Sequence, residues 1–509
     1  MRPATVAASG LLLATALRLE AQGTPASASS PLLPCCHLSA DGLVPIADSL
    51  AGVLRATGLA SSLHDLRTAV PSRRVVLSGS RRSGAWHRPQ EPAAVAHVDA
   101  GAAGWRSLGA WTAAGSAVWR RQREDEVRWR NTSDAYLGSP YIWADNVGGT
   151  WRSDVVTLTA AVGSPAWRGL RLGLGSDYAI GQGARRNASR PLYRRRVLEL
   201  TPALTWTLGA HELAAGLTRG WHREDLEVGG GSFGDPTIVR LRGISTFDRT
   251  QLISAERAVL GDVTGAVLGY AWRGRRWTSS LAWRRRVELD SVRDGIARPE
   301  FGGASRRVRQ DARGVVRRTG HDGGVEGLLM YATEAARGTD PIFRAVNQLD
   351  IGSRGELLLS LWRGATLPTA RWLAAIDGTV QSLDRRDVVG ETRWSAQLHE
   401  AGIRALHRRA IGGLTVITGA RAAITGVSAS DYLARRPSEL TPILAEADFA
   451  MVSAPRRTVD AILGVEWGHG AAGGATGRAR VEGVLATSEN TRAADAARRT
   501  RLRLILELF

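Results

Sequence analysis

The chain has 509 residues, of which 44% are apolar and 23% are charged. This balance excludes wholesale disorder and a bundle of membrane-spanning helices. The formal net charge is +19, and the chain contains no lysine, so all 67 basic residues are arginines. They are spread along the whole length without a helix-turn-helix, zinc-finger or RNA-binding signature. We therefore expect no nucleic-acid partner.

The first 21 residues have the features of a secretory signal peptide. Arg2 precedes an apolar run over residues 10–17, and Ala21 is a small residue suited to cleavage. No other stretch has the roughly twenty consecutive apolar residues that a spanning helix requires. The rest of the chain is therefore either soluble or crosses a membrane as strands, which only a closed barrel can do.

Residues 22–70 are expected to form a partly helical periplasmic or plug segment, because Leu43, Ile46 and Leu50 follow helical spacing. The alternative is a lead-in that packs at a barrel rim. The two cysteines, Cys35 and Cys36, are adjacent, which excludes a disulfide framework and a four-thiolate metal site. Acylation of Cys35 is disfavoured by its distance from the apolar run.

Apolar residues recur at alternate positions over residues 197–208 and again over 212–222, with a tight turn at 209–211. This period of two predicts a β-hairpin whose strands are long enough to cross a bilayer. The same unit recurs over residues 156–180. Charged residues in the polar phase are candidate lumen-facing residues, namely Arg171, Asp177, Glu199 and Arg284.

Residues 71–509 are predicted to form one antiparallel, up-and-down transmembrane β-barrel of about 16 strands, with a range of 14–18. Further candidate strands cover residues 108–119, 263–272, 277–289, 325–332, 355–362, 372–381, 411–424, 444–452, 459–467 and 479–486.

Two classes of connection alternate along the chain, which is typical of an outer-membrane barrel with short periplasmic turns and long outer loops. Short turns are expected at residues 164–166, 209–211 and 274–276. Long links are expected at residues 124–149, 182–193, 229–236, 290–305 and 425–440.

Tryptophan is frequent, with 17 residues, and several lie near predicted strand ends, as the aromatic girdles of such barrels do. Examples are Trp105, Trp119, Trp151, Trp167, Trp221 and Trp277. Ordinary core tryptophans are the alternative. The chain ends on an amphipathic strand with leucines at 502, 504, 506 and 508, although Phe509 falls on the opposite phase.

The first third of the predicted barrel contains a set of motif residues, namely Arg88, Pro89, Asn131, Pro140, Tyr141, Asp145, Gly148 and Gly149. In these motifs the chain resembles an uncharacterised family of bacterial outer-membrane β-barrel proteins, known only as a domain of unknown function. The resemblance implies the architecture and location but no activity. One Asp-Pro-Arg-Pro run of the family is replaced here by residues 186–191, so any role of its acidic residue is not carried over.

No chemistry-bearing motif emerges from the sequence. His211 and His222 flank one predicted strand, and His407 and His469 are isolated, so none has metal-ligand spacing. The triglycine at 229–231 lacks a following Lys-Ser/Thr and is not a phosphate-binding loop. We expect no catalytic residues, cofactor or metal, and therefore no enzyme.

The leading hypothesis is a porin-like or accessory transport barrel in the bacterial outer membrane, since about sixteen strands can enclose an aqueous lumen. Inward arginines would favour anions. Expected partners are membrane lipid, lipopolysaccharide and the barrel-assembly machinery, with a further envelope protein unidentified. The alternative is a structural or docking barrel that serves a receptor, secretion or surface-assembly system.

Overall fold

The computed structural model describes residues 73–136, 139–186, 190–229, 238–249, 256–295, 298–364, 370–468, 477–488 and 497–508. The predicted signal peptide, the segment 22–70 with its two cysteines, and Phe509 lie outside the described residues. Among the described residues, no helix has both the length and the apolar character needed to span a bilayer.

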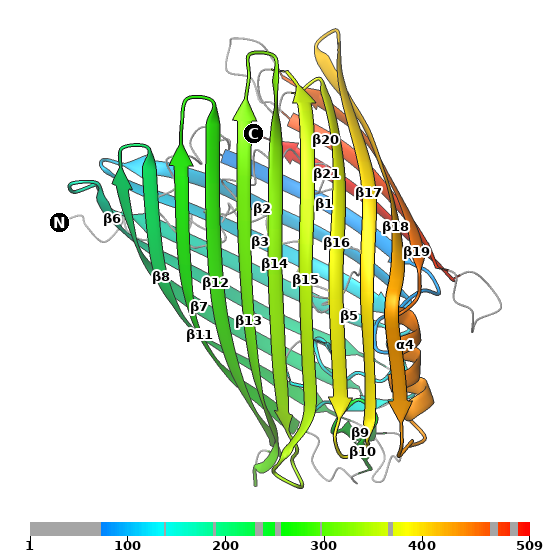
Figure 1. Cartoon of the computed structure of the whole chain (residues 1–509). Coiled ribbons are helices and arrows are strands. Elements are labelled where there is room, and N and C mark those ends of the chain that lie inside the picture. Colours follow the sequence, from blue (N-terminus) through cyan, green and yellow to red (C-terminus); the bar gives the residue numbers. More distant parts are fainter. Residues whose placement is uncertain are drawn as a thin grey trace.

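Eighteen antiparallel strands form one closed sheet, at the upper end of the expected range (Figure 1). Each strand pairs with the next along the chain, and β1 pairs with β21 to close the ring, with Val75 opposite Leu508. The barrel strands are β1 (Arg73–Ser83), β2 (Ala94–Leu108), β3 (Trp111–Asp125), β5 (Trp151–Gly163), β6 (Leu170–Arg185), β7 (Pro191–Leu208), β8 (His211–Val228), β11 (Glu256–Arg273), β12 (Trp277–Asp294), β13 (Glu300–Thr319), β14 (Gly323–Thr339), β15 (Val346–Arg363), β16 (Trp372–Asp387), β17 (Thr392–Ile411), β18 (Leu414–Ala434), β19 (Arg456–Trp467), β20 (Gly477–Ser488) and β21 (Ala497–Leu508).

The outward face of the barrel is apolar over much of its height. On β21, Leu502 and Leu504 are exposed to the outside, whereas Ile505 and Glu507 are buried on the inner face. Leu172 and Leu217 are likewise exposed on β6 and β8. This alternation is the pattern of a strand with one lipid-facing and one lumen-facing side.

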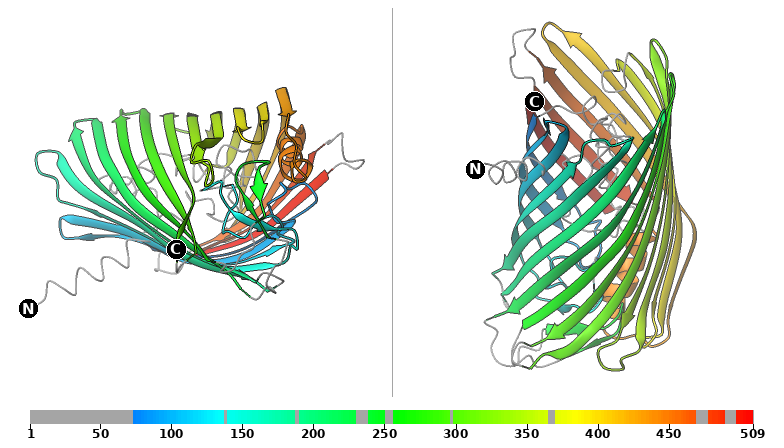
Figure 2. Two further views of the ribbon diagram at one scale, coloured as in Figure 1. Left: turned by 90° about the horizontal axis from the view of Figure 1, so that it is seen from below. Right: turned by 90° about the vertical axis from the view of Figure 1, so that its left-hand side faces the viewer.

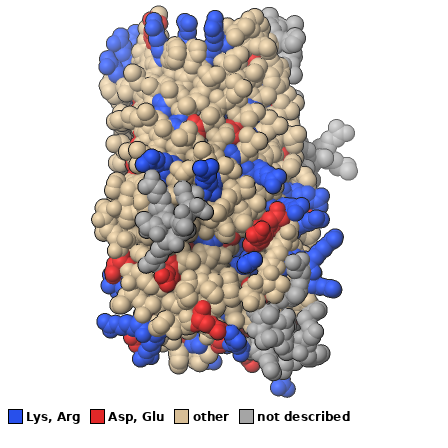
Figure 3. Space-filling view, turned by 90° about the vertical axis from the view of Figure 1, so that its right-hand side faces the viewer, with Lys and Arg blue, Asp and Glu red and all other residues tan. Residues whose placement is uncertain are grey.

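The apolar outer surface lies towards the end of the barrel with the short turns. In the other half, outward positions carry exposed arginines such as Arg121, Arg194 and Arg223. Figure 3 shows one side of the wall, where charged side chains are sparse over much of the upper half and denser below. Many strands have 15 or more residues, while about 9–11 suffice to cross a bilayer. We infer that the strands project beyond the membrane on the long-loop side.

Four connections at the long-loop end fold back inside the ring of strands (Figure 2). Their described parts are residues 84–93, 126–136, 139–150, 238–249 and 435–455, and together we call them the plug. Within it, β4 (Trp143–Asp145), β9 (Ile238–Leu241) and β10 (Phe247–Asp248) form a separate three-stranded sheet. A π-helical segment, η3 (Thr441–Glu446), leads into the short helix α4 (Ala447–Val452).

Three expectations from the sequence are wrong. Residues 444–452 are helical, because Leu440, Leu444 and Val452 lie at helical intervals and are buried. The links expected at 182–193, 290–305 and 425–440 are largely strand, because these strands extend past the apolar band and become polar on both faces. Trp151 does not belong to an outer girdle, since it is buried under the plug with Val127 and Tyr193.

A closed barrel predicts a simple behaviour on gels. After detergent extraction, an unheated sample should migrate differently from a boiled one, because the closed hydrogen-bonded sheet has no edge from which to unravel. Identical migration of the two samples would contradict the barrel.

Candidate functional site

Arg88 and Asp448 link three plug connections to the barrel wall. Arg88 binds Asp448 through two nitrogens, with Nη2 2.7 Å from Oδ2, and its guanidinium lies 3.4 Å from the centre of the Tyr136 ring. Asp448 also accepts from Arg385 of β16, 3.3 Å away, and Arg385 pairs in turn with Asp350 of β15. All of these groups are buried or nearly so.

Asp145 and Arg185 form a second buried pair. Nη2 of Arg185, at the end of β6, lies 2.5 Å from Oδ2 of Asp145, and neither side chain is exposed at all. The backbone around them forms a hairpin, in which Trp129 N donates to Asp145 O over 2.8 Å. Gly148 lies in this hairpin with φ of 68°, and an added Cβ would meet the Arg128 side chain at 2.8 Å.

The Tyr141 side chain fills a recess in the barrel wall. The recess exists because the two wall residues behind it are glycines. A Cβ added to Gly303 of β13 would lie 2.3 Å from the Tyr141 ring, and one added to Gly338 of β14 would lie 2.6 Å from its hydroxyl. Arg257 of β11 donates to the Tyr141 carbonyl over 2.7 Å. Burial raises the pKa of Tyr141, and the nearby Asp340 carboxylate adds to this.

The residues 242–246 attach the plug to the wall on the side of β14 and β16. Arg242 binds Asp340 with contacts of 2.8 and 3.0 Å. Asp387, at the end of β16, accepts from the backbone nitrogens of Ser245 and Thr246 at 3.1 and 2.9 Å. Gly243 sits directly against this carboxylate, where a Cβ would meet Oδ2 at 2.2 Å.

The family-like motif residues therefore lie in the plug. Six of them, namely Arg88, Asn131, Tyr141, Asp145, Gly148 and Gly149, take part in the contacts just described or in the hairpin around Asp145. Pro89 and Pro140 adjoin Arg88 and Tyr141, and a Cβ on Gly338 would meet Pro140 at 3.0 Å. These residues form backbone turns, pack closely against glycines or carry buried charge, and these contacts account for their types.

A cavity lies between the plug segment 132–143 and the inner wall of β7, β8, β11, β12 and β13. It has about 210 Å³ of space for water-sized molecules, and six arginines and four carboxylates line it. The arginines are Arg195, Arg257, Arg284, Arg286, Arg307 and Arg309. Carboxylates of the wall partner several of them: Arg284 lies 2.9 Å from Asp311, and Arg286 lies 2.5 Å from Glu199.

The four candidate lumen-facing residues lie on the inner face of the wall. Arg284 lines the cavity, and Glu199 contacts Arg286 beside it. Asp177 lies directly opposite Glu199 in the β6–β7 register, which places both on one face. Arg171 lies opposite the buried Thr205, and it is an even number of residues from Asp177 on β6, so both side chains point to the same face.

The cavity also holds a group that spacing along the chain does not predict. His222 of β8 lies beside Glu288 and Asp290 of β12, more than sixty residues away in the sequence. The three residues become neighbours because β8 and β12 lie on either side of β11 in the barrel. The pairing register of β8, β11 and β12 would have predicted this group, but that register cannot be derived from a single sequence.

The Arg88–Asp448 pair predicts how the plug is held. Asp448→Asn removes one charge of a buried pair and should weaken the plug's attachment by about 3 kcal/mol. Trypsin should then cut at Arg435 or Arg436 at least about tenfold faster, while the barrel stays intact. The matched control is Asp384→Asn, which breaks a more exposed pair with Arg386 on the outer face. Equal cleavage of both variants would show that other contacts hold the plug.

Glu91 predicts the behaviour of the plug in acid. Burial by itself would raise the pKa of this carboxyl, but Arg499, Arg82 and Arg88 outweigh it and lower the pKa from 4.5 to about 2. Ionised Glu91 therefore stabilises the fold above pH 4.5 by about 3 kcal/mol, and this is lost as the pH falls towards 2. Wild type should melt at a higher temperature than Glu91→Gln at pH 7, and the difference should shrink below pH 4.5. A difference that does not vary with pH would contradict this.

Several solved structures of outer-membrane proteins are loosely similar to this chain. The FrpB iron transporter from Neisseria meningitidis (F3-3 variant) is 10% identical, with 87% of this chain and 83% of that chain covered and a TM-score of 0.39. The ferric preacinetobactin receptor BauA from Acinetobacter baumannii is 7% identical, with 85% and 80% covered and a TM-score of 0.37. The outer membrane transporter YddB from Escherichia coli is 8% identical, with 85% and 80% covered and a TM-score of 0.37.

A comparison with curated proteins finds no match. In contrast, one family model covers residues 61–504, which is most of the chain and includes all eighteen barrel strands in whole or in part. Its description is "Family of unknown function (DUF6850)". The chain therefore belongs to this uncharacterised family, DUF6850.

Proposed function

We propose that this protein is a bacterial outer-membrane barrel that moves small solutes, with a preference for anions, past its plug. The observation that carries the proposal is the arginine-lined cavity between the plug and the wall. An apolar outer face supports residence in a membrane, and a closed sheet with a charged inner face supports a hydrated interior.

Polar contacts hold the plug to the wall on the side of β14 and β16. Asp387 accepts from the Ser245 and Thr246 backbone, and Asp340 binds Arg242. Water can replace hydrogen bonds and ion pairs of this kind, because both partners are well solvated when they separate. On another side the plug has apolar contacts with the wall, where Val127 and Trp143 pack with Tyr193 and Leu226, so its displacement would expose these side chains.

The proposed anion preference comes from the charge around the cavity. Six arginines and four carboxylates line the cavity, and carboxylates just outside the lining pair with five of the six arginines, namely Arg257, Arg284, Arg286, Arg307 and Arg309. Arg284 retains 43% side-chain exposure although it contacts Asp311, which leaves its guanidinium accessible to a passing anion. Because carboxylates partner several of the other arginines, we expect a moderate preference and not an absolute one.

Planar bilayer recording tests the proposal. The wild-type barrel should give small conductance steps, and Asp448→Asn should enlarge them or prolong the open state by loosening the plug. Reversal potentials in a chloride gradient should show anion preference, and Arg284→Gln should reduce it.

The control for that variant is Arg285→Gln. Arg285 is the next residue on β12, but its side chain is exposed on the outer face, so its loss should leave selectivity unchanged. If neither wild type nor Asp448→Asn conducts, or if cations are preferred, the proposal that the barrel transports anions is wrong. The docking-barrel alternative would then be favoured.

A further inference from the structure

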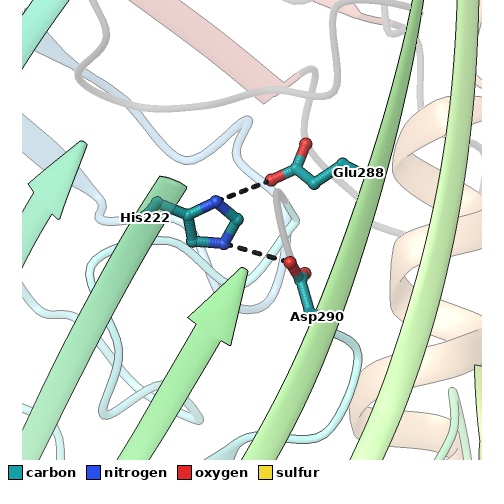
Figure 4. A group of neighbouring side chains, drawn as sticks. All are labelled: His222, Glu288 and Asp290. Atoms are coloured by element: carbon teal, nitrogen blue, oxygen red, sulfur yellow. Dashed lines mark ion pairs between the residues drawn. The ribbon is translucent and has the colours of Figure 1, made fainter. Parts of the chain in front are cut away.

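His222, Glu288 and Asp290 converge on the inner wall beside the cavity. One ligand atom from each residue can be chosen so that all three lie within 4.8 Å of one another. Figure 4 shows the imidazole between the two carboxylates, with one ring nitrogen towards each. Nε2 lies 3.0 Å from Asp290 Oδ1, and Nδ1 lies 3.6 Å from Glu288 Oε1.

The barrel register and a glycine produce this convergence. His222 and Asp290 both lie directly opposite Gly261, on either side of β11. A Cβ at Gly261 would lie 1.9 Å from the His222 ring, so only glycine lets the imidazole cross β11 towards β12. Glu288 is two residues from Asp290 on the same strand and therefore points to the same side.

The separation of the ligand atoms is close to that around a divalent metal ion. Zinc bonds of about 2.0–2.2 Å to nitrogen and carboxylate oxygen place the ligand atoms of a tetrahedral site roughly 3.3–3.6 Å apart. The 3.0 Å between Nε2 and Asp290 Oδ1 is slightly shorter than this, and Glu288 lies at the other ring nitrogen, 3.6 Å from Nδ1. Both carboxylates would therefore have to shift for all three residues to hold one ion. Asp290 Oδ1 is buried and accepts no hydrogen bond from the described residues.

Glu288 has one long contact with an arginine, while the arginines beside it lie closer to other carboxylates. Arg286 is 3.8 Å from Glu288 but lies closer, 2.5 Å, to Glu199. Arg307 contacts Glu334 at 3.4 Å. The other oxygen of Asp290 accepts from Ser305 over 3.2 Å, which orients the carboxylate, as outer partners of metal ligands commonly do.

The group opens onto the arginine-rich cavity, where the carboxylates of Glu224, Glu288 and Asp290 offset part of the positive charge. All three residues of the group line the cavity, together with Thr132 and Ser133 of the plug. These two plug residues are bound to Glu224, which is two residues from His222 on the same face of β8. An ion at His222 would therefore sit next to the point where the plug meets the wall.

We propose that His222, Glu288 and Asp290 form a binding site for a divalent transition-metal ion such as Zn²⁺. One histidine nitrogen and two carboxylates supply three ligands, and the side towards the cavity remains open for water. The site is distinct from the arginines to which we assign solute passage, so either proposal can fail without the other.

Isothermal titration of the purified, detergent-solubilised barrel with Zn²⁺ tests the site. Wild type should bind one ion that a chelator removes. His222→Ala should weaken binding by at least about tenfold, since even outer partners of metal ligands contribute that much. Asp290→Asn should also weaken it. The heat-modifiable gel shift should be unchanged in each variant, which separates loss of the ion from loss of the fold.

The matched control is His399→Ala. His399 also crosses a glycine, since a Cβ at Gly426 would lie 2.4 Å from its Nε2, but the His399 side chain is exposed on the outer face. Binding by this variant should equal that of wild type. Absence of Zn²⁺ binding in wild type, or equal affinity in wild type and His222→Ala, would overturn the proposal.

Discussion

Closure of the sheet is the constraint on which the rest of this structure depends. A hydrocarbon environment offers no partner to a free backbone N–H or C=O, so a spanning sheet must have no edge. The pairing of β1 with β21 removes that edge, and it continues from Val75 opposite Leu508 to Ser83 opposite Thr500. Once the ring is closed, side chains can only point outwards to lipid or inwards to the lumen.

That division explains where the charges of this arginine-rich chain lie. An arginine facing the middle of the bilayer costs about 2–4 kcal/mol, so arginines at membrane level face inwards and require carboxylates. Arg421 is an example, because it reaches Asp377 at 2.6 Å and Glu400 at 2.8 Å while almost fully buried. Several outward arginines, such as Arg194 and Arg223, lie in the half of the barrel away from the short turns. The arginines of this chain are therefore divided between paired positions on the inner wall and exposed positions on the outer face.

The sequence predicted the features that depend on local periodicity. Alternation over residues 197–222 predicted β7, β8 and their turn, and the inward phase of Glu199 follows from the same pattern. It did not predict where strands end, because beyond the membrane both faces are polar and alternation disappears. The helix α4 was mistaken for a strand, although Pro442 and the spacing of Leu440 and Leu444 favour a helix.

The candidate sites required information that a single sequence does not contain. The motif residues were found, but their common location was not, because Arg88 and Asp448 are 360 positions apart and meet only through folding of the plug. His222 and Asp290 meet across Gly261, which depends on the register of three strands.

Glycine connects these cases. Gly261, Gly303 and Gly338 each leave room on the inner wall for a large side chain, namely His222 at the first and Tyr141 at the other two. In a barrel wall, an inward glycine therefore marks a place where another residue approaches the backbone closely. A lipid-facing position needs only an apolar side chain, whereas an inward glycine is required by one particular neighbouring side chain. The most specific sequence signals of this chain accordingly lie in the plug and at the inward wall positions that contact it.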